Sequence, residues 1–104
     1  MQYSLIIGRF QPWHEGHRAL VQSVLDDGEI PCVAIRDTVK DDNNPYSVSE
    51  REEMIRKDFP DIKIITIPDI SEVVYGRKVG YGIREVHLHP DIEAISGTNI
   101  RKGI

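Results

Sequence analysis

Three short apolar stretches alternate with two amphipathic stretches along the first two-thirds of the chain, and this alternation most constrains its fold. The apolar runs at residues 3–8, 31–37 and 62–67 have the length of buried strands. The stretches at residues 17–28 and 47–59 carry helical apolar spacing or helix-end signals. Strands that alternate with helices favour parallel βαβ units with right-handed crossovers.

Residues at the ends of the two amphipathic stretches support their assignment as helices. Gly28 stands where a helix C-cap belongs. Ser47 precedes Glu50 by three residues, which is the spacing of a capping box. Acidic residues fill the first turns of the second helix and basic residues its last turn, as the helix dipole favours, and Pro60 ends it.

The last third of the chain predicts two more strands, at residues 72–75 and 84–89, and a short helix within residues 95–104. The predicted fold class is α/β: a small Rossmann-like parallel sheet of five strands in the order 3-2-1-4-5, flanked by three helices. One domain would span residues 1–104. Ligands of such sheets bind beyond the carboxyl ends of the strands, where the strand order reverses, which here is at Gly8.

Composition and charge narrow the classes of function. The 104-residue chain is 39% hydrophobic and 29% charged, as in an ordinary globular protein, and its net charge of −4 argues against nucleic acid as a partner. No apolar run approaches the ~18 residues of a membrane span, and no leader precedes the first strand. Cys32 is the only cysteine and allows no intrachain disulfide. We therefore expect a cytoplasmic protein with no membrane partner.

Two histidines, His14 and His17, lie between the first predicted strand and the first predicted helix, in the sequence GRFQPWHEGH. The simplest interpretation is a tight turn in which the histidines are incidental. Their position favours a ligand, because the unpaired backbone N–H groups at the start of a helix attract phosphate. Together with Arg9, the imidazoles would suit a highly charged phosphate ester.

Zinc binding is the other interpretation of the histidines. His87 and His89 would lie on one face of a strand and could complete a four-histidine site with His14 and His17. The helical zinc motif H-E-x-x-H, however, places its histidines four residues apart rather than three. Gly16 is also a poor residue inside a helix. We therefore expect no metal ligands from the protein.

Three segments resemble one known family. GRFQPWHEGH is similar to the signature of the H-x-G-H nucleotidyltransferase superfamily, and GRFQP is most similar to archaeal-type nicotinamide-mononucleotide adenylyltransferases. ISGTNIR, at residues 95–101, resembles the superfamily signature I-S-x-T-x-x-R. NPYSVSEREEMI, at residues 44–55, resembles the loop and helix that those adenylyltransferases carry after their second strand. Two specific motifs in the right order are the basis of this assignment.

The resemblance implies transfer of a nucleoside monophosphate, with AMP from ATP favoured, to a small phosphorylated acceptor such as nicotinamide mononucleotide. Pyrophosphate would leave with Mg²⁺ neutralising its charge, through positioning and electrostatics rather than a covalent enzyme intermediate. The implied catalytic residues are His14, His17 and Arg101. The implied nucleotide-binding residues are Gly8, Arg9, Phe10, Gly16, Ile95, Ser96 and Thr98.

Other interpretations remain open at this point. The chain could instead be a cytidylyltransferase that uses CTP and a phosphorylated alcohol, or a nucleotide-binding module without activity. Trp13, Arg36, Arg77 and Lys78 are candidates for acceptor or phosphate contacts, although a tryptophan that seals the turn is as consistent with the sequence. Only PDIS, at residues 68–71, separates the third and fourth predicted strands, where members of the family carry a full helix. A shortened crossover is compatible with a homodimer.

Overall fold

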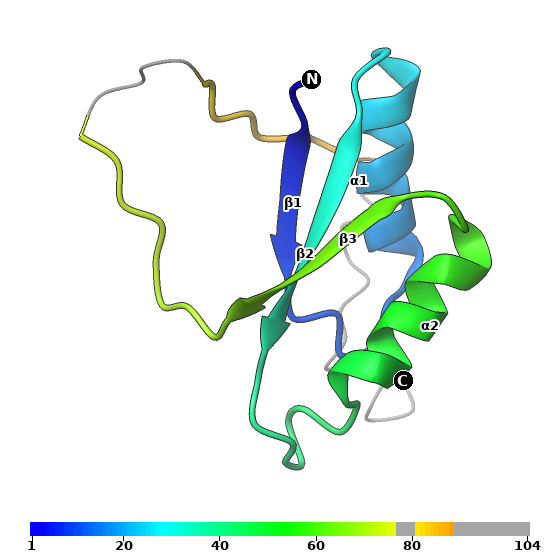
Figure 1. The fold of residues 1–104 in the computed structure, drawn as a ribbon, viewed down its shortest axis with the longest axis vertical. Coiled ribbons are helices and arrows are strands. Elements are labelled where there is room, and N and C mark those ends of the chain that lie inside the picture. The colour runs from blue at the N-terminus through cyan, green and yellow to red at the C-terminus, as the bar shows by residue number, and fades with distance from the viewer. Residues whose placement is uncertain (77–80, 89–104) are drawn as a thin grey trace.

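The computed structural model describes residues 1–76 and 81–88. Over these residues the chain is a small α/β protein whose elements follow the predicted order (Figure 1). The elements are β1 (Ser4–Gly8), α1 (Glu15–Asp26), β2 (Pro31–Asp37), α2 (Val48–Asp58) and β3 (Lys63–Pro68). The first three predicted strands and the first two predicted helices are therefore confirmed. No helix in these two ranges is long and apolar enough to cross a membrane.

The three strands form one parallel sheet in the order β1-β2-β3, which confirms this part of the predicted order. In the register, Ile6 of β1 lies beside Val33 of β2, and Val33 lies beside Ile64 of β3. β2 is in the middle and is buried from Pro31 to Ile35. Its apolar run without alternation is what a strand covered on both faces requires.

The core lies between the sheet and the two helices, which cover the same face of the sheet (Figure 1). Val21 of α1 and Ile55 of α2 are fully buried against Val33 and Ile35 of β2. Each such side chain contributes about 1.5–3 kcal/mol when it leaves water. On the other face, Leu5 of β1 remains 54% exposed.

The helix ends form as the sequence predicts. Gly28 has a φ of 76°, and its N–H donates to the carbonyl of Leu25 at 3.0 Å, while the N–H of Glu29 donates to that of Val24 at 3.1 Å. These two bonds constitute a Schellman motif, which needs the left-handed conformation that glycine adopts most easily. At α2, Ser47 and Glu50 form the reciprocal capping box, with both bonds at 3.1 Å.

The prediction of strands at residues 72–75 and 84–89 is wrong over the residues that the structure describes, because residues 72–76 and 81–88 are in no strand. For the strand predicted at residues 72–75 the connection is the reason: a parallel strand beyond β1 needs a crossover of a dozen or more residues, and residues 69–71 are too few. Val73 and Val74 are instead 64% and 80% exposed. The predicted helix in residues 95–104 lies outside the described residues, as do strand positions beyond 88.

Ion pairs, and no strand ladder, connect residues 81–88 to the rest of the described structure. After β3 the chain runs away from the sheet, and residues 81–88 return to it near the start of β1 (Figure 1). There the guanidinium of Arg84 contacts the carboxylates of Asp27 at 2.6 Å and Glu29 at 2.9 Å. The hydroxyl of Ser4, at the start of β1, also donates to Glu29. Exposed pairs of this kind contribute little free energy.

Candidate active site

The turn between β1 and α1 is built on a close contact between Gly8 and Phe10. Phe10 has a φ of 54°, and its side chain is only 2% exposed. A Cβ added to Gly8 would lie 2.7 Å from Cε1 of the Phe10 ring, closer than atoms tolerate. Glycine at position 8 is therefore required by the approach of the ring. Phe10, predicted as a nucleotide contact, lies in the core under the turn.

Trp13 seals this turn. Its ring is 6% exposed, meets Phe10 edge to face at 5.4 Å and stacks on His17 at 5.5 Å. Its indole Nε1 donates to Oδ2 of Asp58, the last residue of α2, at 2.8 Å. Of the two interpretations of Trp13 from the sequence, the buried position matches the structural one.

His14 and His17 cap the amino end of α1. His14 is the N-cap residue, and its Nδ1 accepts from the N–H of Gly16 at 3.1 Å. The Nδ1 of His17 accepts in return from the N–H of His14 at 3.2 Å. The two rings stack with centroids 3.8 Å apart. Imidazoles thus form the capping box that serine and glutamate form elsewhere, and each Nδ1 must lack a proton to accept.

Both imidazoles are neutral at physiological pH. Burial, with smaller contributions from His14 and Arg18, lowers the pKa of His17 from 6.5 to about 3. Burial, and then the charge of Arg18, also lowers the pKa of His14. A neutral imidazole with an accepting Nδ1 carries its proton on Nε2, so each ring is a hydrogen-bond donor there. Such a pair can bind phosphate oxygens, and His17, with its pKa of about 3, is a poor general base at pH 7.

We expect the thermal midpoint to fall as the pH is lowered from 6.5 to 4.5. The pKa of His17 is lower in the folded state than in the unfolded state, so the unfolded chain binds more protons in this range and is favoured. Asp41 and Glu50, whose pKa values are lowered by hydrogen bonds from Asn44 and Ser47 respectively, contribute in the same direction, but only toward the acid end of this range, where the unfolded carboxylates begin to bind protons. Differential scanning calorimetry across this range measures the effect.

The matched variant for this experiment is His17→Gln. Glutamine at the third helical position can still complete a capping box, but it has no proton to gain. Its midpoint should therefore change less with pH than that of the parent chain. A parent midpoint that stays constant from pH 6.5 to 4.5 would contradict the neutral, buried imidazole.

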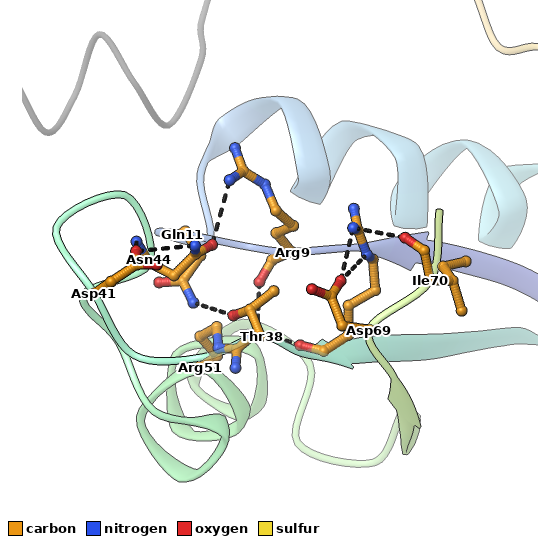
Figure 2. Close-up of polar contacts among 9 residues, drawn as sticks. Arg9, Gln11, Thr38, Asp41, Asn44, Arg51, Asp69 and Ile70 are labelled. Carbon is orange, nitrogen blue, oxygen red and sulfur yellow. Dashed lines mark hydrogen bonds and ion pairs between the residues drawn. The ribbon is translucent and has the colours of Figure 1, made fainter. Parts of the chain in front are cut away.

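A polar network ties the loop between β2 and α2 to the histidine turn (Figure 2). The side-chain amide of Gln11 donates to the carbonyl of Tyr46 at 3.0 Å and accepts from its N–H at 2.9 Å. The same amide donates to the hydroxyl of Thr38 at 3.1 Å. Nη1 of Arg9 donates to Oδ1 of Asn44 at 3.2 Å. Because the acceptor on Asn44 is neutral, this bond orients the guanidinium without neutralising its charge.

Arg36 lies at the carboxyl end of β2, as predicted, but its guanidinium is engaged. Nη2 lies 2.7 Å from Oδ1 of Asp69 and also donates to the carbonyl of Ile70 at 2.9 Å (Figure 2). This pair fastens the chain that follows β3 to the end of β2. A phosphate contact from Arg36 would have to compete with Asp69, so Arg9 is the better candidate of the two.

Comparison with known proteins places this geometry in a family. The model of the family described as "Cytidylyltransferase-like" matches residues 5–71. The chain belongs to the cytidylyltransferase-like family. The match includes all of the sheet except Ser4, both helices and the histidine turn.

Curated relatives of this cytidylyltransferase-like chain carry a more specific name. A nicotinamide-nucleotide adenylyltransferase of Methanolobus tindarius is 35% identical over 72 residues, covering 65% of this chain and 42% of that protein. One from Saccharolobus solfataricus is 37% identical over 79 residues, covering 67% of this chain and 46% of that protein. The chain thus spans less than half the length of these two relatives.

A solved structure shares the fold. It is the crystal structure of a bifunctional NMN adenylyltransferase/ADP ribose pyrophosphatase from Francisella tularensis, complexed with AMP and Mn ion. The TM-score is 0.53 and the sequence identity is 27%, over 64% of this chain and 22% of that one. The assignment to the cytidylyltransferase-like family is therefore supported by similarity of structure as well as of sequence.

Only part of the predicted site can be placed in this cytidylyltransferase-like chain. The structure brings together the six predicted nucleotide-binding and catalytic residues of the turn and first helix, which are Gly8, Arg9, Phe10, His14, Gly16 and His17. The candidates Trp13 and Arg36 also lie in the described part, whereas Arg77, Lys78, Ile95, Ser96, Thr98 and Arg101 lie outside it.

Sequence reasoning missed four residues that support the turn: Gln11, Asn44, Arg51 and Asp58. Each acts through a contact between segments 35 or more positions apart in the chain, such as Gln11 with Tyr46 or Trp13 with Asp58. Gln11 falls inside GRFQP, and Asn44 and Arg51 fall inside NPYSVSEREEMI, so these two segments indicate the neighbourhood of the site. The sequence does not show which residue each of these side chains contacts.

Proposed function

We propose that the chain is the nucleotidyl-transfer domain of an adenylyltransferase, which transfers AMP from ATP to nicotinamide mononucleotide and releases pyrophosphate. The single observation that supports this most directly is the stacked, neutral pair His14 and His17 at the amino end of α1. Two Nε2–H groups beside the helix end form a site for phosphate. The names of the relatives favour adenylyl transfer and this acceptor.

In the proposed reaction, an oxygen of the acceptor phosphate attacks the α-phosphorus of ATP in line. The new P–O bond forms as the bond to the β-phosphate oxygen breaks, and pyrophosphate leaves with the electron pair. The acceptor phosphate is already ionised near neutral pH, so no general base is needed. This matches His17, whose pKa of about 3 makes it a weak base.

His14, His17 and Arg9 would stabilise the negative charge that develops on the phosphate oxygens. Donors fixed before the reaction begins are effective because they need no reorganisation. The capping bonds fix both imidazoles, and the bond to Asn44 orients Arg9. Gly8 and Phe10 would act by shaping the turn rather than by touching the nucleotide. Ser96, Thr98 and Arg101 would hold the β- and γ-phosphates, as the resemblance of ISGTNIR implies.

The residues of the turn do not fit a protein-bound metal ion. Their groups are N–H donors and a cation, and no cluster of three or more histidine, cysteine or acidic residues suited to a metal occurs within residues 1–76 and 81–88. Mg²⁺ prefers oxygen ligands and commonly binds through substrate phosphates. We therefore propose that it enters as MgATP, as part of the substrate.

Pyrophosphate release tests the proposed function. The purified chain is incubated with Mg²⁺ and either ATP or CTP, each with nicotinamide mononucleotide or a phosphorylated alcohol. We expect pyrophosphate and the dinucleotide product with ATP and nicotinamide mononucleotide. Turnover restricted to CTP would instead indicate a cytidylyltransferase, which the description of the matched family makes the second candidate.

Calorimetric titration with MgATP completes this test. Binding without pyrophosphate release from any pair would identify a nucleotide-binding module. Neither binding nor release with any triphosphate would reject the proposal. His87→Ala provides a control variant, because the imidazole of His87 is exposed and lies far along the chain from the histidine turn.

A further inference from the structure

Arg51, in the first turns of α2, is a buried charge that the proposed reaction does not use. Its side chain is 0% exposed, and among the described residues it is the only charged residue that is buried. Taking a guanidinium out of water is costly unless hydrogen bonds or opposite charges compensate. The hydrogen bonds of the Arg51 guanidinium therefore indicate the role of this residue.

The guanidinium of Arg51 binds backbone carbonyls instead of a carboxylate. Nη1 donates to the carbonyl of Arg9 and to that of Arg36, both at 2.7 Å (Figure 2). Nε donates to the carbonyl of Ser47 at 3.1 Å. Nη2 is buried and has no partner in the part of the chain that the structure describes. In that part, no carboxylate lies within ion-pair distance, although the charge of Asp37 opposes the effect of burial, which lowers the pKa of Arg51.

The two carbonyls mark the point where the strand ladder between β1 and β2 stops. Gly8 of β1 and Ile35 of β2 are the last paired residues, and Arg9 and Arg36 are the next residue on each strand. One nitrogen of Arg51 therefore bridges the two strands one step beyond their last pair. This contact fixes how far the strands separate, at the edge where parallel sheets bind their ligands.

We propose that Arg51 is a positioning residue of the nucleotide site, which holds the carboxyl ends of β1 and β2 together so that Arg9 and the histidine turn keep the geometry that binds a nucleoside triphosphate. The inference rests on the proposed function. Arg51 also places a buried positive charge behind the turn. A charge in a region of low dielectric constant attracts a polyanion more strongly than one at the surface.

Substitution of Arg51 tests the inference, with Arg56 as the matched control. Arg56 is in the same helix and also donates to two carbonyls, those of Pro60 and Ile62 at 3.1 and 3.3 Å, but its side chain is exposed and lies at the other end of α2. The variants are Arg51→Lys, Arg51→Met, Arg56→Lys and Arg56→Met. The measurements are the Kd for MgATP, kcat and KM for pyrophosphate release, and the thermal midpoint.

We expect Arg51→Met to raise the Kd for MgATP at least about tenfold, which is the effect of losing one hydrogen bond to a charged group. Arg51→Lys keeps the charge but not the fork that reaches both strands, so its Kd should lie between those of the parent and Arg51→Met. Both Arg56 variants should bind as the parent does. An Arg51→Met variant with a lower midpoint but an unchanged Kd and KM would overturn the inference in favour of a purely structural role.

Arginine-labelled NMR of the parent chain tests the bridge without any variant, should the Arg51 variants not fold. The guanidinium protons of Arg51 should exchange slowly and shift on addition of MgATP, whereas those of Arg56 should exchange fast and not shift. Exchange as fast as that of Arg56 would overturn the bridge. A parent chain that binds no triphosphate would instead reject the proposed function, so the two failures are distinguishable.

Discussion

The His17→Ala variant is expected to release pyrophosphate about 10²–10³ times more slowly than the parent chain, the usual loss for one donor to the transition state. The imidazole is held by its capping bond to the N–H of His14 and by stacking on Trp13, so its Nε2–H is fixed in direction. Alanine removes this donor. The loss should fall mainly on kcat, because the donor binds the charge that develops during the reaction more strongly than it binds the substrate.

His87→Ala and the thermal midpoint serve as controls for this result. His87→Ala removes an exposed imidazole and should leave kcat unchanged. The thermal midpoint of His17→Ala shows whether this variant is folded at the assay temperature, because loss of the capping bond costs about 0.5–2 kcal/mol. A folded His17→Ala variant with the kcat of the parent would remove this histidine from the mechanism.

The Gly8→Ala variant should lose about 1–3 kcal/mol of stability, the cost of overfilling a packed site. The added methyl group would meet the ring of Phe10 at 2.7 Å, and that ring also contacts His17 with centroids 4.8 Å apart. Relief of the contact must move the ring, and the imidazole with it. A misplacement of about 1 Å can cost about 10²-fold, so we expect kcat to fall by that order.

Gly82→Ala and Gly76→Ala are matched controls for Gly8→Ala. A methyl group added at either position would meet no atom within 4 Å. Both variants should keep the midpoint and kcat of the parent in chemical denaturation and pyrophosphate assays. If Gly8→Ala were as stable and as active as these two, the contact between Gly8 and Phe10 would not govern the turn.

The sequence predicts β1, β2, β3, α1 and α2 because the signals for these elements are local. Each strand is an apolar run, and the two helices end at signals within a few residues, such as Gly28 at α1 and Ser47 with Glu50 at α2. Parallel pairing then follows from the alternation of strands and helices. The strands predicted at residues 72–75 and 84–89 are absent over residues 72–75 and 84–88. For the first of them, the apolar pattern says nothing about whether the connection is long enough to reach the far side of β1.

The candidate site is predictable to a smaller extent. The sequence places His14 and His17 at the start of a helix, but it does not show that their Nδ1 atoms cap it. Trp13 illustrates the limit, since a buried and a ligand-stacking ring look identical in the sequence. The choice depends on Asp58, 45 positions away, and on the bond from its carboxylate to the indole. The role of Arg51 cannot be predicted from the sequence either. Its partners are backbone carbonyls, which every residue type carries.

The carboxylate of Asp58 has a practical consequence for anyone who redesigns the surface of α2. It accepts from Nε1 of Trp13 at 2.8 Å and from Nη1 of Arg18 at 3.3 Å, and both donors flank the imidazoles. A solubility screen that recharges this helix should leave Asp58 alone, although its side chain is 36% exposed. The side chain of Glu53, in the same helix, makes no hydrogen bond or ion pair within residues 1–76 and 81–88, so this is the safer position to change.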